Sequence, residues 1–598
     1  MTQIQRSGSS PRVGFAGLGS MGLGMAVNLV KAGYAVAGFD PSEQARKSFE
    51  ASGGIAVDSL EELCEANSSH YFVMVATAGQ VDSVMFGTDG LVAHLPQNAA
   101  VCLCCTLPPT YVVDLPKRLE NCGREDLRLV DCPVSGGAIG ALKGTLSIMM
   151  AGDEPVIEEL NPELKAMAAP DRLFYYGALG TASTLKMLNQ HLAGTHIVAA
   201  AEILAFARSL GLSTREALKV LQASPASSWI LGDRGEHMLD ADWTPKSAVE
   251  IFVKDLGIVN DCADEVSFAC PLASEAFSVF LKTTARGFGR QDDAFVVNNY
   301  EQITKKKVAE PEREPPASEN RDGLAAGHFA PLSSLDPSPR VARLLESLNV
   351  EQQGDASGPQ ITIFEHGSGP IDEVNEKLAA LGAGSIVVVI GLSDKQRVAA
   401  FEKDIKDQHS HIQVVNGQII PNQECAMAPQ ASERKRPSDS PDTLACVQKA
   451  LPSSIASHGI SGSFESATLM SLTIRYGSII HVAAAAELYG LIVAMGIPPE
   501  LVYKLVAGAA GSSTQFIKQF PFMINRDFDI SSQDSTGLWN EFSLQCTAAD
   551  SKILQSLTRS LMFPATLLNA AHQIIKDANA RGSEQHTSLA TIVCRWDK

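Results

Sequence analysis

The stretch RVGFAGLGSMGLGMAVNLVKAGYAVAGFD, residues 12–40, decides the fold of the first part of the chain. It contains a short apolar strand, a glycine-rich turn, a helix and a second strand, and its glycines follow the pattern G-x-G-x-x-G. In a dinucleotide-binding turn, the first glycine permits the tight turn, the second lets a pyrophosphate approach the backbone, and the third lets helix and strand pack closely. The free N–H groups at the start of the helix would then face the phosphates. The predicted phosphate-binding residues are Gly17, Leu18, Gly19, Ser20, Met21 and Gly22.

An acidic residue at the end of the second strand indicates which dinucleotide is preferred. Asp40 lies 18 residues after Gly22, where a carboxylate can accept hydrogen bonds from the ribose hydroxyls. The same carboxylate would repel a 2′-phosphate, and the next residue, Pro41, offers no arginine to neutralise one. We therefore expect NAD to be preferred over NADP. The alternative, a glycine turn without a ligand, is disfavoured because strand, turn, helix and acid all stand in the required order.

Working outward from this unit, the chain divides into alternating strands and helices and then into helices alone. Strand-like segments at 71–77, 99–106 and 128–134 continue the pattern of a doubly wound parallel sheet. From about residue 179 long helices rich in Ala and Leu follow, and then a stretch dense in Pro, Glu and Lys. The predicted organisation is a flexible N-terminus (1–11), a Rossmann NAD-binding domain (12–178), an all-helical substrate and dimerisation domain (179–304), a disordered linker (305–357), a truncated Rossmann-like domain (358–425), a second linker (426–440) and a second helical domain (441–598).

The second half repeats the first with an offset of 285 residues in the helical part. The segment HIVAAAE at 196–202 returns as HVAAAAE at 481–487, and further matches occur at the same offset. The matching positions are His196 with His481, Glu202 with Glu487, Ser227 and Ser228 with Ser512 and Ser513, and Met238 with Met523. The corresponding glycine region of the second copy, FEHGSGPIDEV, lacks the dinucleotide spacing, so we expect this copy to bind no dinucleotide.

Composition narrows the classes of function. A net charge of −19 disfavours a nucleic-acid partner, because phosphate binding requires a basic surface. We expect no membrane partner, because no run approaches the roughly 18 apolar residues of a membrane span. The polar N-terminus lacks a secretory signal, and the 12 cysteines lack metal-type spacing. We therefore predict a cytoplasmic protein without a metal, whose CLCC run at 102–105 is buried in a strand.

Two segments carry candidate chemistry. In DCPVSGGAIG, from residue 131, a strand ends in Ser135, Gly136 and Gly137, whose hydroxyl and backbone N–H groups could receive a carboxylate. In the helix that begins near 181, Lys186, Asn189 and Gln190 follow at i, i+3 and i+4 and share one face. A lysine removed from water has a lowered pKa and can move a proton at neutral pH. From these segments alone, an ordinary turn and a lysine reaching solvent at a helix end remain open alternatives.

Together these motifs resemble the β-hydroxyacid dehydrogenase family, which includes 3-hydroxyisobutyrate dehydrogenase, with closest similarity to its L-threonate dehydrogenase branch. The resemblance runs nearly continuously over 12–300, in GLGSMGLGMA, CTLPP, DCPVSGG, GTASTLKMLNQ, FVKDLGIV and GFGRQDDAFVV. It implies that Lys186 is the general acid/base and that hydride passes from a hydroxy acid to the nicotinamide. The residues it assigns to the substrate are Ser135, Gly136, Gly137, Asn189, Gln190 and Lys254, and those it adds to the cofactor site are Thr77, Thr106 and Lys254. Many members have Asn where this chain has Gln190, a change we interpret as substrate choice.

The second copy lacks this chemistry. At the offset of 285, Lys186 corresponds to Ser471, or to Met470 after one insertion, and Gln190 to Arg475. After a ten-residue insertion, Ala549 stands opposite Lys254. We predict a catalytically inactive copy that docks on the first as a built-in partner, forming an intramolecular pseudo-dimer that could dimerise further. Two alternatives remain: an NADPH-dependent glyoxylate or succinic semialdehyde reductase, and a non-catalytic NAD-binding scaffold.

Overall fold

The computed structural model describes residues 12–65, 68–310, 464–526, 544–581 and 592–593, together with six strands between residues 330 and 459. The flexible N-terminus predicted for 1–11 and much of both predicted linkers lie outside the described residues. The chain divides into two compact units. The first holds Met1–Thr195, Trp243–Phe295 and Gly490–Ser512, and the second holds His196–Asp242, Val296–Tyr489 and Ser513–Lys598. A short segment of the C-terminal half therefore belongs to the same unit as the glycine-rich turn.

The first unit is built on a mainly parallel sheet in the order β3-β2-β1-β4-β5-β6-β8-β7, with β9 paired to β8. The strand order reverses between β1 and β4, which is the point at which doubly wound sheets bind ligands beyond the carboxyl ends of their strands. This confirms the predicted Rossmann fold. The strands are β1 Arg12–Ala16, β2 Ala35–Phe39, β3 Ile55–Ala56, β4 His70–Val73, β5 Ala100–Leu103, β6 Arg128–Asp131, β7 Val134–Ser135, β8 Leu146–Gly152 and β9 Ala168–Tyr175.

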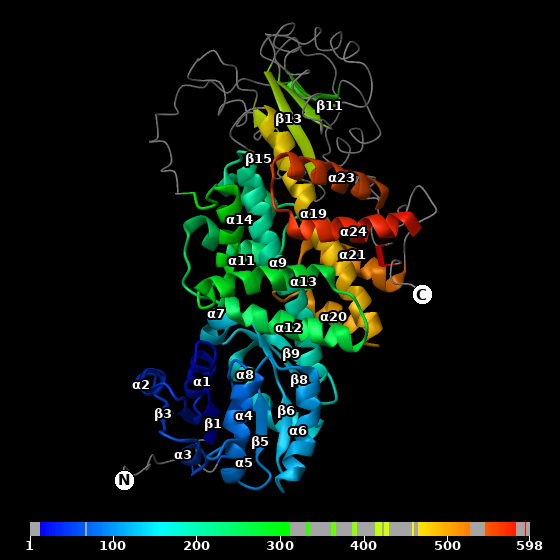
Figure 1. The fold of residues 1–598 in the computed structure, drawn as a ribbon. Coiled ribbons are helices and arrows are strands. Elements are labelled where there is room, and N and C mark those ends of the chain that lie inside the picture. Colours follow the sequence, from blue (N-terminus) through cyan, green and yellow to red (C-terminus); the bar gives the residue numbers. More distant parts are fainter. Residues whose placement is uncertain are drawn as a thin grey trace. The chain divides into compact units, whose positions relative to one another are not determined.

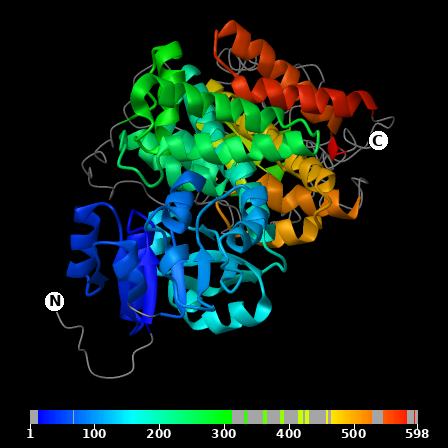
Figure 2. The same ribbon diagram turned by 60° about the horizontal axis from the view of Figure 1, so that its bottom comes forward.

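Helices cover both faces of this sheet (Figures 1 and 2). One buried cluster joins the strands to α1, α2, α7 and α8, and a second joins them to α3, α4, α5 and α6. Alternate side chains of one strand face opposite clusters, as Phe15 and Ala16 of β1 do. The helices are α1 Gly22–Lys31, α2 Glu43–Ala51, α3 Leu60–Glu65, α4 Ala78–Phe86, α5 Leu91–His94, α6 Pro109–Asn121, α7 Gly137–Lys143 and α8 Glu154–Met167.

The chain is helical from residue 181 to residue 304, as the Ala- and Leu-rich pattern predicts. Its longest element, α9, spans 29 residues and contributes its first half to one compact unit and its second half to the other. The elements are α9 Thr181–Ser209, α10 Thr214–Gln222, α11 Trp229–Asp240, α12 Val249–Glu265, α13 Pro271–Thr283, the π turn η1 Thr284–Phe288, the 3-10 turn η2 Asp293–Val296 and α14 Val297–Thr304.

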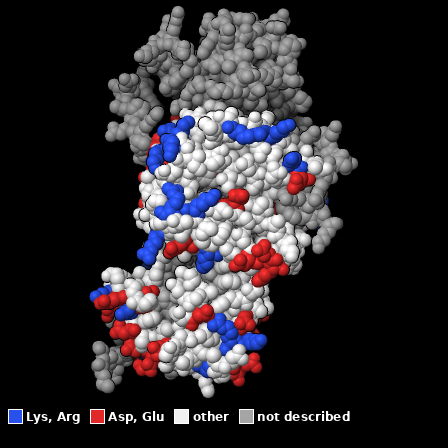
Figure 3. Space-filling view, viewed as in Figure 1, with Lys and Arg blue, Asp and Glu red and all other residues white. Residues whose placement is uncertain are grey.

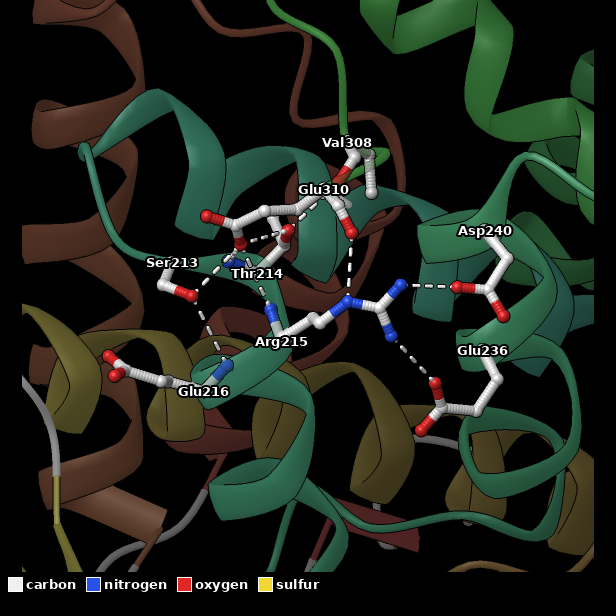
Figure 4. A network of polar contacts seen from close by, with 8 residues as sticks. All are labelled: Ser213, Thr214, Arg215, Glu216, Glu236, Asp240, Val308 and Glu310. Carbon is white, nitrogen blue, oxygen red and sulfur yellow. Dashed lines mark hydrogen bonds and ion pairs between the residues drawn. The ribbon is translucent and has the colours of Figure 1, made fainter. Parts of the chain in front are cut away.

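The start of the predicted linker is part of the folded helical region, which corrects the expected boundary at residue 305. Val308 is fully buried, and the Glu310 carboxylate accepts hydrogen bonds from the backbone N–H groups of Thr214 and Arg215 at 2.9 and 3.3 Å. Because these amides open α10, Glu310 satisfies donors that a helix N-terminus leaves free. Figure 4 shows the network, in which the Arg215 side chain also donates to the Glu310 carbonyl. The Pro- and Glu-rich composition of this segment did not predict that Val308 is buried or that Glu310 caps a helix.

The described strands of the second half form a sheet of their own, in the order β10-β11-β12-β13-β14-β15. Strands β10 to β13 are parallel, whereas β14 runs antiparallel to β13. The order follows the chain without a reversal, so these strands lack the switch point of a Rossmann sheet. The sheet also extends into both predicted linkers and into the predicted second helical domain, which corrects the range 358–425. The strands are β10 Ala330–Ser334, β11 Gln360–Glu365, β12 Ile386–Ile390, β13 Gln413–Ile420, β14 Glu424–Pro429 and β15 Ser457–Gly459.

One helix of the C-terminal half matches a helix of the first half in its length and caps. Helices α11 and α21 both contain 12 residues, and their N-caps, Ser228 and Ser513, are 285 residues apart. Both caps have φ of −143°, and both helices end in a left-handed residue, Ala241 with φ 51° and Arg526 with φ 53°. The matching lengths and caps of α11 and α21 agree with the predicted internal repeat. The helices are α19 Phe464–Ala494, α20 Pro499–Val506, α21 Thr514–Asn525, α23 Leu544–Ser560 and α24 Thr566–Arg581.

Helix α19 corrects the expectation that no segment is apolar enough to cross a membrane. Its residues Leu469–Ala494 form a stretch of 26 residues that is long and apolar enough to cross a membrane, judged by length and composition. Of the most apolar part of this stretch, 89% is buried inside the described part of the protein, as expected for a core helix. The Ala-rich repeat segment HVAAAAE supplies much of this apolar character.

The cysteines of the CLCC run are buried, as the strand pattern predicts. Cys102, Cys104 and Cys105 are at most 1% exposed and are free thiols. Burial raises the pKa of the Cys105 thiol to about 12, so it remains protonated at neutral pH. These residues therefore act as small apolar side chains of the sheet.

Candidate active site

The three glycines of the turn have the separate roles that the motif assigns to them. Gly17 has φ +98°, and a side chain there would meet the Met74 carbonyl oxygen at 2.2 Å. A side chain at Gly22 would meet the Gly17 carbonyl oxygen at 1.9 Å, so helix and turn pack too closely for any other residue. By contrast, the space beside Gly19 is open to 4 Å. The turn therefore has the open face that a pyrophosphate needs.

Asp40 is held against this turn, next to an arginine that the sequence argument did not consider. One carboxylate oxygen accepts a hydrogen bond from the Leu18 N–H at 2.8 Å, and the other accepts one from the Ser42 N–H at 2.8 Å. The Arg46 guanidinium donates to the Asp40 backbone carbonyl at 2.7 Å. The sequence argument considered only Pro41, whereas Arg46 in the first turn of α2 also stands beside the acid. Its i+6 spacing from Asp40, across the start of a helix, was the missed signal.

Thr77 and Thr106 both follow sheet strands at their carboxyl ends, where a nicotinamide ring would be expected. Thr77 caps α4 by accepting a hydrogen bond from the Gln80 N–H at 3.2 Å. The Thr106 carbonyl accepts a hydrogen bond from the Lys254 ammonium at 2.9 Å. This bond links the Rossmann sheet to helix α12, and so brings two of the predicted residues, Thr106 and Lys254, together.

The Ser135–Gly137 turn adopts a backbone that only glycine tolerates well. Gly136 has φ +134° and Gly137 has φ +63°, and both conformations are costly for residues with a side chain. Ser135 is 6% exposed at the end of β7, paired with Ser147 of β8. The space beside Gly137 is open to 4 Å, so its backbone is approachable. The turn thus presents a hydroxyl and backbone amides in a fixed arrangement.

Lys186 is buried, which rules out the alternative of a lysine reaching solvent. Its side chain is 6% exposed, and its Nζ donates to the Gln190 Oε1 at 2.8 Å. Burial lowers the pKa of the Lys186 ammonium from 10.5 to about 8; Asp255 acts to raise it and Lys254 acts to lower it. The lowered pKa expected from the sequence is confirmed. At neutral pH an amine with this pKa is readily interconverted between its charged and neutral forms.

Gln190 links Lys186 to an acid that the sequence argument missed. While its carbonyl oxygen accepts from Lys186, its Nε2 donates to the Asp255 carboxylate at 2.6 Å. The other oxygen of Asp255 forms an ion pair with Lys254 at 2.7 Å. One N–H of Gln190, predicted to donate to a substrate, is therefore engaged with Asp255. Asp255 directly follows Lys254 in FVKDLGIV, which was the available signal.

A second buried acid fixes the start of the helix that carries Lys186. Asp131, at the end of β6, accepts hydrogen bonds from the backbone N–H groups of Gly180 and Ser183 at 3.1 and 2.8 Å and from the Ser183 hydroxyl at 2.7 Å. Burial raises the pKa of the Asp131 carboxyl to about 6, against the effect of these donors. The Rossmann sheet thus sets the position of the first turns of α9.

Asn189 completes the polar group on this helix face. It is fully buried, and its Nδ2 donates to the Gln190 Oε1 at 3.1 Å. Its Oδ1 accepts a hydrogen bond from the Gly511 N–H at 3.2 Å. Lys186, Asn189, Gln190 and Lys254 are therefore connected through hydrogen bonds and Asp255, whereas the contacts of Ser135 lie on the strand side of the unit.

Comparison with known proteins agrees with this arrangement. The family model described as the NAD binding domain of 6-phosphogluconate dehydrogenase matches residues 12–177. The model described as NAD-binding of NADP-dependent 3-hydroxyisobutyrate dehydrogenase matches residues 180–300 and again 472–593. The L-threonate dehydrogenase of Escherichia coli K12 is 36% identical over 300 residues, which are 50% of this chain and 98% of that protein. The chain belongs to the β-hydroxyacid dehydrogenase family.

Other relatives support the same assignment. The L-threonate dehydrogenase of Haemophilus influenzae is 35% identical over 49% of this chain and 96% of its own length. The crystal structure of a 3-hydroxyisobutyrate dehydrogenase from Salmonella typhimurium is 35% identical, covers 49% of this chain and 100% of its own, and has a TM-score of 0.46. The family models and the L-threonate dehydrogenase relatives show that the first half is an NAD(P)-dependent β-hydroxyacid dehydrogenase, which confirms the predicted family, fold class and type of enzyme. The second match at 472–593 agrees with the repeated helical domain of this family member.

The second copy keeps one acid of this family site and replaces its other residues. Asp550 corresponds to Asp255, and Arg475, at the position of Gln190, forms an ion pair with it at 2.6 Å. A positive charge thus replaces the neutral amide, and Ser471 or Met470 replaces the lysine. The inactivity of this copy stays a prediction, and the loss of the lysine and the amide is its physical ground.

On the face of the dehydrogenase shown in Figure 3, acidic and basic side chains are interspersed over the described residues. The Lys and Arg side chains form short separate stripes, and groups of Asp and Glu lie between and below them. Membership of the dehydrogenase family implies that a small hydroxy acid is the substrate. The oligomeric state of the protein stays a prediction.

Proposed function

We propose that the first copy oxidises a small, threonate-like hydroxy acid with NAD, and that Lys186 is its general base. The observation that carries the proposal is the buried Lys186 amine with a pKa of about 8, held in the same compact unit as the dinucleotide-type turn at Gly17–Gly22. The names of the L-threonate dehydrogenase relatives support the four-carbon acid. We further propose that the protein is cytoplasmic.

In this mechanism the residues of the chain bind, orient and accept a proton. Ser135 and the amides of Gly136 and Gly137 hold the substrate carboxylate, which fixes the carbinol carbon relative to the cofactor. The neutral Lys186 amine takes the hydroxyl proton, and Gln190 keeps its nitrogen in place. When bound, the nicotinamide supplies the hydride acceptor. The hydrogen bond between Lys254 and the Thr106 carbonyl holds α12 next to the Rossmann sheet, where the substrate and cofactor sites meet.

The pH dependence of turnover follows from the state of Lys186. Oxidation requires the neutral amine, so kcat should rise with pH and level off above about pH 8, the pKa to which burial lowers this group. Reduction requires the charged amine as acid, so its kcat should fall over the same range. Initial rates of both reactions between pH 6 and 10 would measure the midpoint. A profile that is flat across this range would contradict the role of Lys186.

Variants at the two neighbouring charges should move this midpoint in opposite directions. Asp255 raises the pKa of Lys186 and Lys254 lowers it. The change Asp255→Asn should therefore shift the midpoint to lower pH, and Lys254→Met should shift it to higher pH, each by about one unit or more. The two shifts would be measured from kcat profiles, since the absolute rates will also fall. Shifts in the same direction would show that general loss of structure, rather than charge, controls the profile.

A panel of C3–C6 hydroxy acids, each assayed with NAD and NADP by the absorbance of the reduced cofactor, tests the proposal as a whole. We expect turnover of a four-carbon acid with NAD, because the Asp40 carboxylate faces the ribose position. The alternative of an NADPH-dependent aldehyde reductase gains support from one observation, the Arg46 guanidinium beside Asp40. Reduction of glyoxylate or succinic semialdehyde with NADPH, without oxidation of any hydroxy acid, would favour that alternative. Cofactor binding without turnover of any of these compounds would favour a non-catalytic scaffold.

A further inference from the structure

A short loop of the second copy lies in the same compact unit as the candidate active site. The loop joins α20 to α21 with the sequence AGAAGSS, residues 507–513. It touches the first copy at two places that belong to different domains. The Gly511 N–H donates to the Asn189 side chain of α9 at 3.2 Å, and the Gly508 carbonyl accepts a hydrogen bond from Arg172 of β9. The loop therefore joins the helix that carries Lys186 to the edge of the Rossmann sheet.

The first contact fixes the orientation of a buried amide next to Lys186. The Gln190 carbonyl must face Lys186, because its amide nitrogen donates to Asp255. Asn189 can bond to that carbonyl only through its own NH₂ group, which leaves its oxygen facing away. This oxygen is fully buried, and the N–H that satisfies it comes from Gly511. A single polar chain thus runs from Gly511 through Asn189 and Gln190 to Lys186.

The second contact anchors the loop to the strand side of the unit. Arg172 donates through one nitrogen to the Gly508 carbonyl and through Nε to the Ser147 hydroxyl at 3.0 Å. Ser147 is the cross-strand partner of Ser135, the residue proposed to hold the substrate carboxylate. Gly508 is therefore connected to the strand position of Ser135 through Arg172 and Ser147.

The loop also requires glycine where it meets α9. A side chain at Gly511 would lie 2.9 Å from the Asn189 carbonyl oxygen and 3.0 Å from its Oδ1. The helix backbone cannot move easily, because α9 is packed along its length. The close approach thus delivers a backbone N–H to a buried position that a side chain would block.

We propose that Gly511 of the second copy is a positioning residue of the first copy's active site, acting on Lys186 through Asn189 and Gln190. The inference rests on the proposed function and deepens it, since it gives the inactive copy a part in catalysis. The second copy supplies one hydrogen-bond donor and a rigid boundary, while all reacting groups remain in the first copy. A covalently attached copy keeps this loop at high effective concentration.

The test compares Gly511→Ala, Asn189→Ala and the double variant in the full chain, with Gly232→Ala as the matched control. Gly232 lies in α11 with open space to 4 Å around an added side chain, so its variant should keep the wild-type rate. We expect Gly511→Ala to lower kcat/KM for the best hydroxy acid of the panel by about ten- to a hundredfold, as misplacement of a reacting group does. The double variant should lose no more than the worse single variant, because both changes cut the same chain.

A second readout needs no substrate. The rate at which acetic anhydride modifies Lys186, followed by peptide mass spectrometry against pH, reports the titration of this amine, whose pKa is about 8 in the intact protein. Loosening the loop admits water, so Gly511→Ala should move the midpoint of the Lys186 titration to higher pH. A change of stability alone would lower the melting temperature and leave this midpoint unchanged. Unchanged kcat/KM and an unchanged midpoint in Gly511→Ala, or losses that multiply in the double variant, would overturn the inference. If Gly511→Ala does not fold, Asn189→Ala decides: a wild-type midpoint there overturns it. Failure of the proposed function is distinct, because wild-type protein would then turn over none of the panel.

Discussion

Replacement of Lys186 by alanine should reduce kcat for the hydroxy acid by about 10²–10⁴-fold, the range that a positioned acid or base contributes. The dissociation constant for NAD should stay nearly unchanged, because the proposed cofactor groups, the glycine turn and Asp40, follow β1 and β2 and Lys186 lies on α9. The reason for the large loss is that the amine is the group whose pKa of about 8 matches the proton transfer. Steady-state rates with the best acid of the panel, together with NAD binding by fluorescence titration, would measure both quantities.

Two companion measurements make this expectation specific. Lys165→Ala removes an exposed lysine of α8 and should leave kcat at the wild-type value. Small primary amines added to Lys186→Ala should restore part of the rate, since they can occupy the space of the lost side chain and accept the proton. A kcat of Lys186→Ala within a few-fold of wild type would remove Lys186 from the mechanism, and a parallel loss of NAD binding would show that the variant damages the fold.

The features that sequence predicted well are those in which local geometry permits few residues. The glycines at 17, 19 and 22 were assigned separate roles, and the surroundings of each agree with its role. Polar residues at i, i+3 and i+4 share a face of an otherwise apolar helix, so the sequence brought Lys186, Asn189 and Gln190 together but left open whether the lysine is buried. The repeat was readable from a constant offset, and the helix caps Ser228 and Ser513 show it in the backbone.

The features that sequence did not predict depend on contacts between distant segments. The sequence does not distinguish Asp255 from the other acidic residues, because its role depends on the hydrogen bond that it accepts from Gln190. Gly511 lies 322 residues from Asn189, so no local pattern could pair them. The polar composition of residues 305–310 predicted a disordered linker, but Glu310 caps α10 and so keeps this segment on the helical region. The second sheet was expected to repeat the first, but its strand order shows no reversal.

A buried carboxylate forms a polar link between the two helical copies in the second unit. Glu202 of α9 is fully buried and accepts hydrogen bonds from the hydroxyls of Tyr300 and Tyr476 at 2.8 and 2.7 Å. It also accepts the backbone N–H groups of Leu567 and Leu568, at 3.0 and 3.1 Å, which open α24 of the second copy. Burial raises the pKa of the Glu202 carboxyl, and the four donors act in the opposite direction. One residue of the first copy thus caps a helix of the second.

Glu202→Ala should therefore destabilise the full chain by several kcal/mol, because each buried donor that loses its acceptor costs about 1–3 kcal/mol. The variant leaves two hydroxyls and two helix-opening amides without their acceptor, and each unsatisfied buried donor opposes folding. Urea unfolding followed by tyrosine and tryptophan fluorescence would measure the loss. Glu158→Ala, which removes an exposed acid of α8, should change the midpoint little.

The same variant distinguishes docking of the copies from stability of the helical body in general. If Glu202 holds α24 in place, Glu202→Ala should increase hydrogen exchange first at Leu567 and Leu568, whose N–H groups it accepts, and later elsewhere. Glu202→Gln retains an acceptor oxygen of similar size and should lose less than Glu202→Ala, since one side of the amide can still accept two of the four donors. Equal losses in the two variants would show that the size of the side chain, packed beside Phe206 and Tyr476, matters more than its oxygens. Unchanged protection at the start of α24 would show that Glu202 does not hold this helix in place.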